Sequence, residues 1–243
     1  MPGRPPRFSR ERLAQVAFEI ADREGFDAVS MRRVARELGA GTMTLYNYVR
    51  TKDELVALMD DHLMGELLVS EEELARPWRD AFTAILRRTY RLRLQHPWSL
   101  TALQNAGLGR NGLRHAEQTL AALEGSPFSD EQKFTVMAVA DSFVDGHALH
   151  RAEVTAEQAP DAPAGDRSQR VLEMIASGPY PRMRRTWTAL EGWRPEATAW
   201  MDESFERGLT ALLEGLVRLF TDQPRTSSDS PASTGPSSQW PCG

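Results

Sequence analysis

Apolar side chains near the start of the chain recur every three or four positions, which is the spacing of one face of an α-helix. Ser9 precedes this run and is a residue type that favours the helix N-cap. Gly25 follows it, and glycine favours the end of a helix. Segments with the alternating pattern of a strand are scarce. The pattern predicts a first helix between these two residues, with an inward face of Leu13, Val16, Ala17, Ile20 and Ala21.

Two shorter helices joined by a tight turn are predicted next. Ser30 caps the first, Gly39 ends it, and the second begins near Thr42 and runs to about Tyr48. Such a pair over 31–50 is a helix-turn-helix, whose second helix is of a size to enter the major groove of DNA. Thr51 and the glutamate three residues later then predict a capping box for a longer helix ending near 68.

The rest of the chain also has helical periodicity, so we predict an all-α protein. Its N-terminal three-helix helix-turn-helix domain covers 9–54, and a C-terminal helical domain for ligand binding and dimerisation covers 55–221. The Pro-rich segment 1–8 predicts a flexible basic arm, 155–167 a linker, and 222–243 a disordered tail. Further helices are expected over about 77–95, 98–106, 110–124, 129–153, 168–177, 182–190 and 196–221.

The second short helix of the pair has an unusual surface. Leu45 and Val49 are spaced to face inward, which leaves polar and aromatic side chains facing outward or sideways. Hydroxyl and amide groups bond to phosphates and base edges, and a methionine packs on a thymine methyl. On spacing alone, an ordinary hairpin of a helical bundle explains the two helices equally well. The outward residues are Thr42, Met43, Thr44, Tyr46, Asn47 and Tyr48.

Charge and cysteine content narrow the class of protein. Residues 1–52 hold ten Lys or Arg and six Asp or Glu, a net +4, so the remainder carries −9 of the total of −5. A basic segment on an acidic body favours contact with a polyanion. The single cysteine, Cys242, excludes an intramolecular disulfide and fits a reducing cytoplasm. No apolar run is long enough for a membrane span, and no secretory signal is predicted.

The order of residues over 31–55 then decides between the alternatives. Val34-Ala35, Leu38-Gly39, Thr44-Leu45-Tyr46, Tyr48-Val49 and Lys52-Asp53-Glu54-Leu55 closely resemble the DNA-binding domain of the TetR family of repressors. The resemblance implies a homodimer that binds double-stranded DNA at a near-palindromic operator. By position, it implies base or groove contacts from Arg32, Thr42, Met43, Thr44 and Asn47, and backbone contacts from Tyr46, Tyr48 and Lys52; Arg4 and Arg7 of the arm are further candidates.

A second resemblance concerns the body of the chain. Trp78-Arg79, Tyr90-Arg91, His96-Pro97-Trp98 and 205–209 are similar to the C-terminal domain of the tetracycline-repressor subtype. The subtype dimerises through a four-helix bundle, which implies that the helices at 129–153 and 196–221 meet a second copy. The apolar stripe of the last helix is the predicted dimer interface; the alternative is that it closes its own subunit's core. Its members are Phe205, Leu209, Leu212, Leu213, Leu216, Val217 and Phe220.

The resemblance also implies a small-molecule site between the helices of the body. Asp141 and Asp145 stand out in an apolar segment and either face solvent, line this site or pair with arginine. The positions that would match the histidines of the tetracycline repressors fall near Leu68 and Leu103, so an aromatic or polycyclic effector other than magnesium-tetracycline is expected. The candidate lining residues are Leu63, Leu67, Phe82, Leu86, Trp98, Leu103, Gln104, Phe134, Met137, Asp141 and His147.

Other chemical motifs carry little weight. Gly107-Leu-Gly109-Arg-Asn-Gly112 matches a dinucleotide fingerprint, but helices are predicted on both sides where a strand is required. His147 and His150 lie three apart without a third ligand nearby, so no metal and no cofactor is predicted. No arrangement for catalysis is present, and we expect no enzyme activity. The alternative function is a DNA-binding regulator that is controlled by a partner protein or is not controlled at all. A helical enzyme or carrier is the third hypothesis.

Overall fold

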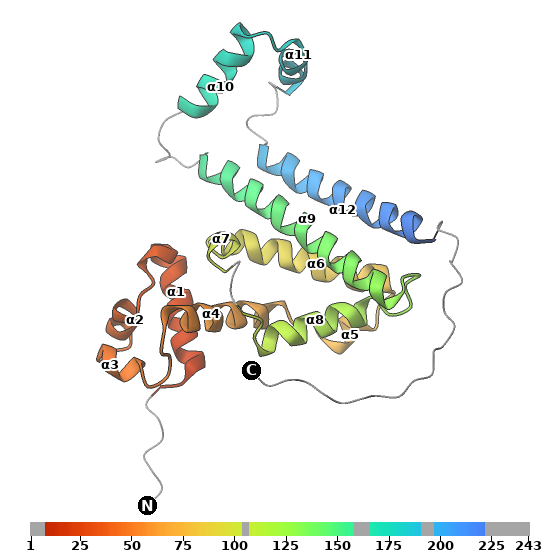
Figure 1. The fold of residues 1–243 in the computed structure, drawn as a ribbon. Helices are drawn as coiled ribbons and strands as arrows, with labels where there is room; N and C mark the ends of the chain where they lie inside the picture. The colour runs from red at the N-terminus through yellow and green to blue at the C-terminus, as the bar shows by residue number, and fades with distance from the viewer. Residues whose placement is uncertain (1–7, 104–106, 158–165, 191–196, 222–243) are drawn as a thin grey trace, which may run out of the picture.

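A computed structural model describes residues 8–103, 107–157, 166–190 and 197–221. Within these ranges every regular element is helical (Figure 1). The elements are α1 (Arg10–Glu24), η1 (Phe26–Ala28), α2 (Met31–Glu37), α3 (Thr42–Leu45), α4 (Lys52–Leu67), α5 (Glu71–Leu74), α6 (Trp78–Gln95), α7 (Ser99–Ala102), α8 (Arg110–Ala122), α9 (Asp130–Glu157), α10 (Asp166–Ser177), α11 (Pro181–Leu190) and α12 (Ala197–Thr221).

Side chains that accept backbone hydrogen bonds fix the starts of the first helices. Ser9 Oγ accepts from the N–H of Arg12 at 3.1 Å, and Ser30 Oγ accepts from Arg33 at 3.2 Å. Thr51 caps α4 as predicted. The rest of the capping box is wrong: Glu54 Oε2 accepts from the N–H of Arg50 at 2.7 Å instead of from the cap residue. A complete capping box stands at α5, a short helix that sequence analysis missed.

A first apolar core holds α1 to α4 together. α1 packs on α4, and α2 and α3 close the end of the pair. Its members with no exposed surface include Leu13, Ile20, Val34, Leu45 and Leu55. The core continues along α4 to Leu67 and includes Leu92 and Leu103, so it extends past the predicted boundary at 54. α4 therefore belongs to both halves of the molecule. We call α1 to α3 with the start of α4 the head, and the remainder the body.

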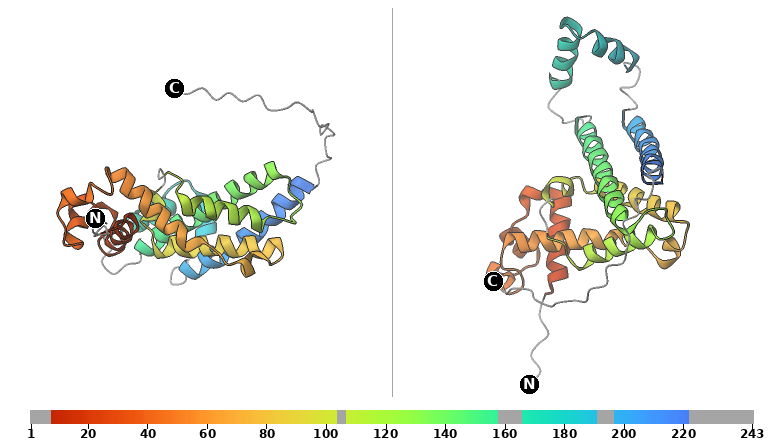
Figure 2. Two further views of the ribbon diagram at one scale, coloured as in Figure 1. Left: turned by 90° about the horizontal axis from the view of Figure 1, so that it is seen from below. Right: turned by 45° about the vertical axis from the view of Figure 1, so that its right-hand side comes forward.

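A second core lies between α6, α8, α9 and α12. α6 and α12 both pack on α9. The ring of Phe205 stacks on that of Tyr90 with centroids 3.9 Å apart, and both are buried. In Figures 1 and 2, α10 and α11 stand apart from this core, beyond the neighbouring ends of α9 and α12. None of the described helices is long and apolar enough to cross a membrane.

Several boundaries differ from the sequence predictions. α3 ends at Leu45 rather than near Tyr48, and residues 46–48 continue as a hydrogen-bonded turn. α9 extends to Glu157, into the segment predicted as a linker. α7 is a single turn over Ser99–Ala102, shorter than the predicted helix over 98–106. The described residues do not include the predicted tail 222–243. Of the predicted arm 1–8 they include Phe8 alone.

Candidate DNA interface and effector site

The turn between α2 and α3 has the geometry of a helix-turn-helix. Gly39 adopts a positive φ of 61°, a conformation in which a side chain is strained. The N–H of Ala40 then donates to the carbonyl of Ala35 at 2.9 Å, which fixes the turn. Leu45 and Val49 have no exposed surface and anchor α3 in the head's core. The backbone of α3 is thus held rigidly against α1 and α2.

Most of the residues predicted to read DNA are exposed. Met43 is 79% exposed and Tyr46 43%, a high exposure for large apolar side chains. Asn47, Arg32 and Lys52 are also exposed, while Thr42, Thr44 and Tyr48 are half-buried. Tyr48 is tied down, because its ring meets Phe8 edge-on and its carbonyl accepts from Arg10 at 3.0 Å. Lys52 stands over the ring of Phe26, with its Nζ 5.1 Å from the ring centroid.

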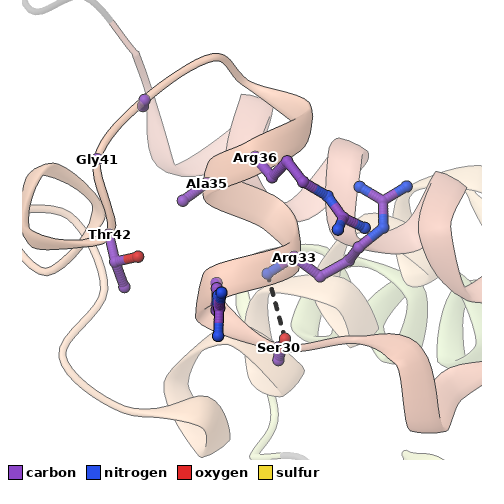
Figure 3. A pocket seen from close by; sticks show the side chains of 8 residues that line it. Ser30, Arg33, Ala35, Arg36, Gly41 and Thr42 are labelled. Atoms are coloured by element: carbon purple, nitrogen blue, oxygen red, sulfur yellow. Dashed lines mark hydrogen bonds between the residues drawn. The ribbon is translucent and has the colours of Figure 1, made fainter.

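An open pocket of about 550 Å³ lies between α2 and the start of α3 (Figure 3). Arginine side chains at 32, 33 and 36 line it together with Gly41 and Thr42. Sequence analysis missed Arg36. Its position four residues after Arg32, on the same face of a helix, was the sequence signal that could have identified it. The pocket brings cationic side chains next to the N-terminus of the helix predicted to read DNA.

The three arginines of this pocket differ in their partners. Arg33 donates to Glu24 at 2.5 Å and to Glu37 at 2.6 Å. The hydrogen bond from Arg33 holds the pKa of Glu24 at about 2, well below its usual value, and lowers that of Glu37. Among the described residues, neither Arg32 nor Arg36 has an ion-pair partner. Two exposed guanidinium groups are therefore available for an anion such as phosphate.

A carboxylate of α1 joins the head to the body. Asp22 Oδ1 accepts from Nε1 of Trp98 at 2.7 Å and lies 2.7 Å from Nδ1 of His96. The ring of Phe18 meets His96 and Trp98 edge-on. His96 and Trp98 flank the turn between α6 and α7. A movement of that turn would therefore displace residues that contact α1 directly.

A second carboxylate joins α4 to the start of α8. Asp61 Oδ1 accepts from the backbone N–H of Asn111 at 2.6 Å, and its carbonyl accepts from the side-chain amide of Asn111 at 2.9 Å. A Cβ at Gly109 would lie only 2.6 Å from Cγ of Asp61. The glycine-rich segment that matched a nucleotide motif thus leaves room for the Asp61 side chain to cap α8.

Arg93 of α6 links this helix to α9 and α7 in the body. Nε of Arg93 donates to Asp145 of α9 at 3.0 Å, and its Nη1 donates to Ser99 of α7 at 3.3 Å. Burial raises the pKa of Asp60 on α4 to about 6, and the positive charge of Arg93 partly offsets the rise. Asp141 of α9 has the same shift, caused first by burial and then by the neighbouring Asp145. Burial lowers the pKa of His115 on α8, and Arg93 adds to that effect.

The predicted effector-site residues do not all come together. Leu63, Leu67 and Leu103 are buried in the first core, and Phe82 and Leu86 in the second. Trp98 is half-buried at the contact with α1, where its indole N–H donates to Asp22, and its place in the pocket lining stays a prediction. Gln104 lies outside the described residues.

The candidate lining residues of α9 divide between two directions. Phe134 is 63% exposed, Met137 is half-buried and Asp141 has exposed surface. His147 faces the opposite way, with its ring 4.2 Å from that of Phe143 and 5.9 Å from that of Phe205. His147 therefore packs towards α12, on the side of α9 away from Asp141.

The stripe of α12 predicted as a dimer interface faces its own subunit. Phe205, Leu209, Leu213 and Leu216 are buried in the second core, and Leu212, Val217 and Phe220 pack against it. The alternative that the sequence left open, closure of the subunit's own core, accounts for these positions. The four buried residues have almost no surface left for a second copy.

Comparison with known proteins identifies the family. A family model described as bacterial regulatory proteins, tetR family, matches residues 13–59, and one described as tetracyclin repressor-like, C-terminal domain, matches 73–220. The HTH-type transcriptional repressor DrrR1 of Streptomyces coeruleorubidus is 34% identical over 189 residues, which are 74% of this chain and 69% of that protein. The chain belongs to the TetR family.

The structural neighbours of this TetR-family chain include ligand complexes. The crystal structure of the Streptomyces coelicolor TetR family protein ActR in complex with actinorhodin has a TM-score of 0.69 and 28% identity, covering 87% of this chain and 96% of that chain. An HTH-type transcriptional regulator of Saccharopolyspora erythraea is 29% identical over 217 residues, which are 87% of this chain and 86% of that protein. As a TetR-family member, the chain is a helix-turn-helix transcriptional repressor, in a family of DNA-binding regulators rather than enzymes.

Proposed function

We propose that the chain is a ligand-responsive repressor that binds a palindromic operator as a homodimer and is released by a small aromatic or hydrophobic effector. The observation that supports DNA binding is the exposed surface of α2 and α3. Met43, Tyr46 and Asn47 are exposed on a rigidly anchored turn, next to two guanidinium groups without ion-pair partners. In this arrangement α3 enters the major groove while Arg32 and Arg36 approach phosphates.

The dimer contact that we propose lies on the outer faces of α9 and α12. Ala138, Ser142 and Gly146 follow one another along the side of α9 opposite to its buried residues. On α12, Ala211 and Gly215 are exposed. A side chain added at Gly146 or Gly215 would meet no atom of the subunit, so both backbones are open to close approach. Such faces suit a four-helix bundle formed with a second copy.

The two carboxylate contacts support release by an effector. α1 of the DNA-reading head meets the turn between α6 and α7 through Asp22, and α4, which begins at the head, is tied to α8 through Asp61. The two heads of a dimer must sit about one DNA turn apart, roughly 34–36 Å. An effector that binds better to a conformation with another α4 position lowers the fraction of protein that fits the operator.

The test is a gel shift of the purified protein with the DNA that flanks its own gene, with and without a panel of aromatic compounds. We expect a shifted band that one class of compound reverses. A band that no compound reverses would contradict effector control. A failure to bind any flanking or genomic duplex would contradict the DNA-binding half of the proposal.

A further inference from the structure

Lys52, the first residue of α4, contacts an aromatic ring rather than a carboxylate. Its Nζ lies 5.1 Å from the centroid of the Phe26 ring, and among the described residues no ion pair involves Lys52. An aromatic ring attracts an ammonium group through its quadrupole and leaves most of its N–H donors free, whereas a carboxylate would accept from them. The exposed side chain of Lys52 is thus held in place while its donors stay available to a phosphate oxygen.

The ring of Phe26 is itself held by a residue of the body. The indole of Trp98 lies nearly parallel to it, with ring centroids 6.0 Å apart and an interplanar angle of 9°. Both side chains are half-buried and pack against the first core. Phe26 belongs to η1 in the head and Trp98 to the turn between α6 and α7, so this stacking contact joins the two parts of the molecule.

Trp98 is fixed by further contacts at the same junction. Its Nε1 donates to Asp22 at 2.7 Å, and its ring meets that of Phe18 edge-on with centroids 5.0 Å apart. Trp98 directly precedes α7, for which it is the N-cap residue. A shift of the turn between α6 and α7 therefore carries the indole with it and moves the surface on which the ring of Phe26 rests.

We propose that Trp98 is a positioning residue for operator binding: through the ring of Phe26 it holds the ammonium group of Lys52 where a DNA phosphate is bound. This inference rests on the proposed function and names a route by which the body regulates it. Ordering a long side chain in advance removes part of the entropy cost of binding. A turn that withdraws Trp98 frees Lys52 and weakens the operator complex.

The test is a double-mutant cycle on operator affinity. The probe is a fluorescent duplex that the wild-type protein selects from a library with a randomised centre, and anisotropy measures its affinity for the full chain. Trp98→Leu should weaken binding about two- to fivefold, the size of an exposed cation–π contact. In a chain that already carries Lys52→Ala, Trp98→Leu should weaken binding no further, because the side chain that it positions is gone.

The salt dependence of binding tests the end point of this route. Lys52→Ala should reduce the slope of log affinity against log salt by about 0.9, the value for one lost phosphate contact. An unchanged slope in Lys52→Ala would overturn the proposal, because Lys52 would then have no phosphate to bind.

Three further variants separate positioning from general damage. Trp98→Phe keeps a ring against Phe26 and should recover most of the affinity that Trp98→Leu loses. Trp78→Leu is the matched control, because Trp78 is a half-buried indole of the body whose ring meets Phe128 edge-on; operator affinity should stay unchanged. Phe26→Leu breaks the same route next to Lys52 and should reproduce the result of Trp98→Leu, so it decides the question if Trp98→Leu fails to fold.

The outcomes distinguish this inference from the proposed function. Equal losses from Trp98→Leu with and without Lys52→Ala would overturn the positioning role, because they would reflect general damage to the head. No loss, or a loss as large in Trp98→Phe, would overturn it as well; the second result would assign the effect to the hydrogen bond with Asp22. Failure of the wild-type protein to select any duplex would overturn the repressor function itself.

Discussion

Two carboxylates of the head and two of the body differ in their partners. In the head, Glu24 and Glu37 are both held by Arg33, and the two arginines without ion-pair partners point outward. In the body, by contrast, neither Asp60 nor Asp141 has a hydrogen-bond or ion-pair partner in the part of the chain that the structure describes, and desolvation raises the pKa of each to about 6. The difference indicates that the head pairs these carboxylates and leaves two arginines for an outside anion, whereas in the body two carboxylates lower the stability of the fold once they ionise.

The largest effect is expected from a variant that weakens the core of the head and leaves the second core unchanged. Leu45→Ala deletes a side chain with no exposed surface and should cost about 2–5 kcal/mol of unfolding free energy. The second core lacks Leu45, so the body should keep its helicity while DNA binding is lost. Circular dichroism during urea unfolding and a gel shift measure the two effects. A single unfolding step with loss of all helix would show that head and body do not fold separately.

A smaller change tests the tie between α4 and α8. Gly109→Ala places a Cβ against the Asp61 carboxylate and should destabilise the fold by about 1–3 kcal/mol, the usual cost of overpacking. Gly107→Ala is the matched control, because a Cβ there meets no atom within 4 Å. Thermal unfolding compares the two. Equal melting temperatures would mean that Asp61 moves aside freely and does not hold α8.

The contact between head and body is tested through α1. Asp22→Asn keeps the size of the side chain and an acceptor oxygen for Trp98 but removes the negative charge of that acceptor. We expect a loss of about 1 kcal/mol in stability, the usual difference between a hydrogen bond to a charged acceptor and one to a neutral acceptor. We also expect a smaller effect of any effector on operator affinity. Gel-shift titrations of wild type and variant at fixed effector concentration measure it. An undiminished effector response would assign the coupling to α4 alone.

The pH dependence of stability should have opposite signs in the two regions. Glu24 has a folded pKa of about 2 against an ordinary 4.5, so the stability it contributes is present above 4.5 and is lost as the pH falls towards 2. Asp60 and Asp141 have folded pKa values near 6 against 3.8, so they destabilise the fold above pH 6 and cease to do so as the pH falls through that window.

The double variant Asp60→Asn with Asp141→Asn isolates the second effect. The neighbouring titratable residues, Asp61, Arg93, His115 and Asp145, stay unchanged in this variant. We expect wild type to lose stability relative to the variant between pH 5 and 7.5, measured by urea unfolding at each pH. A constant difference over this range would show that the two carboxylates are well solvated.

Sequence predicted the head better than the body, for physical reasons. Short-range signals such as Ser9, Ser30 and Gly39 act within one helix turn, so caps and the turn were confirmed. The stripe from Phe205 to Phe220 was ambiguous, because periodicity shows that a face is apolar but not which partner covers it. Arg93, Asp60 and His115 stand on three different helices, and no local sequence pattern reveals that Arg93 lies near the other two. The hydrogen bond from Trp98 to Asp22 joins residues 76 apart in the sequence, so no local signal could predict it.

The most direct test of the central claim is the affinity of the purified chain for its operator, measured by fluorescence anisotropy at several salt concentrations. Arg36→Ala should weaken binding and reduce the slope of log affinity against log salt by about 0.9, the value for one lost phosphate contact. Arg76→Ala, an exposed arginine just before α6 in the body, should change neither. Equal loss in both variants, or none in Arg36→Ala, would contradict the assignment of the α2–α3 surface to DNA.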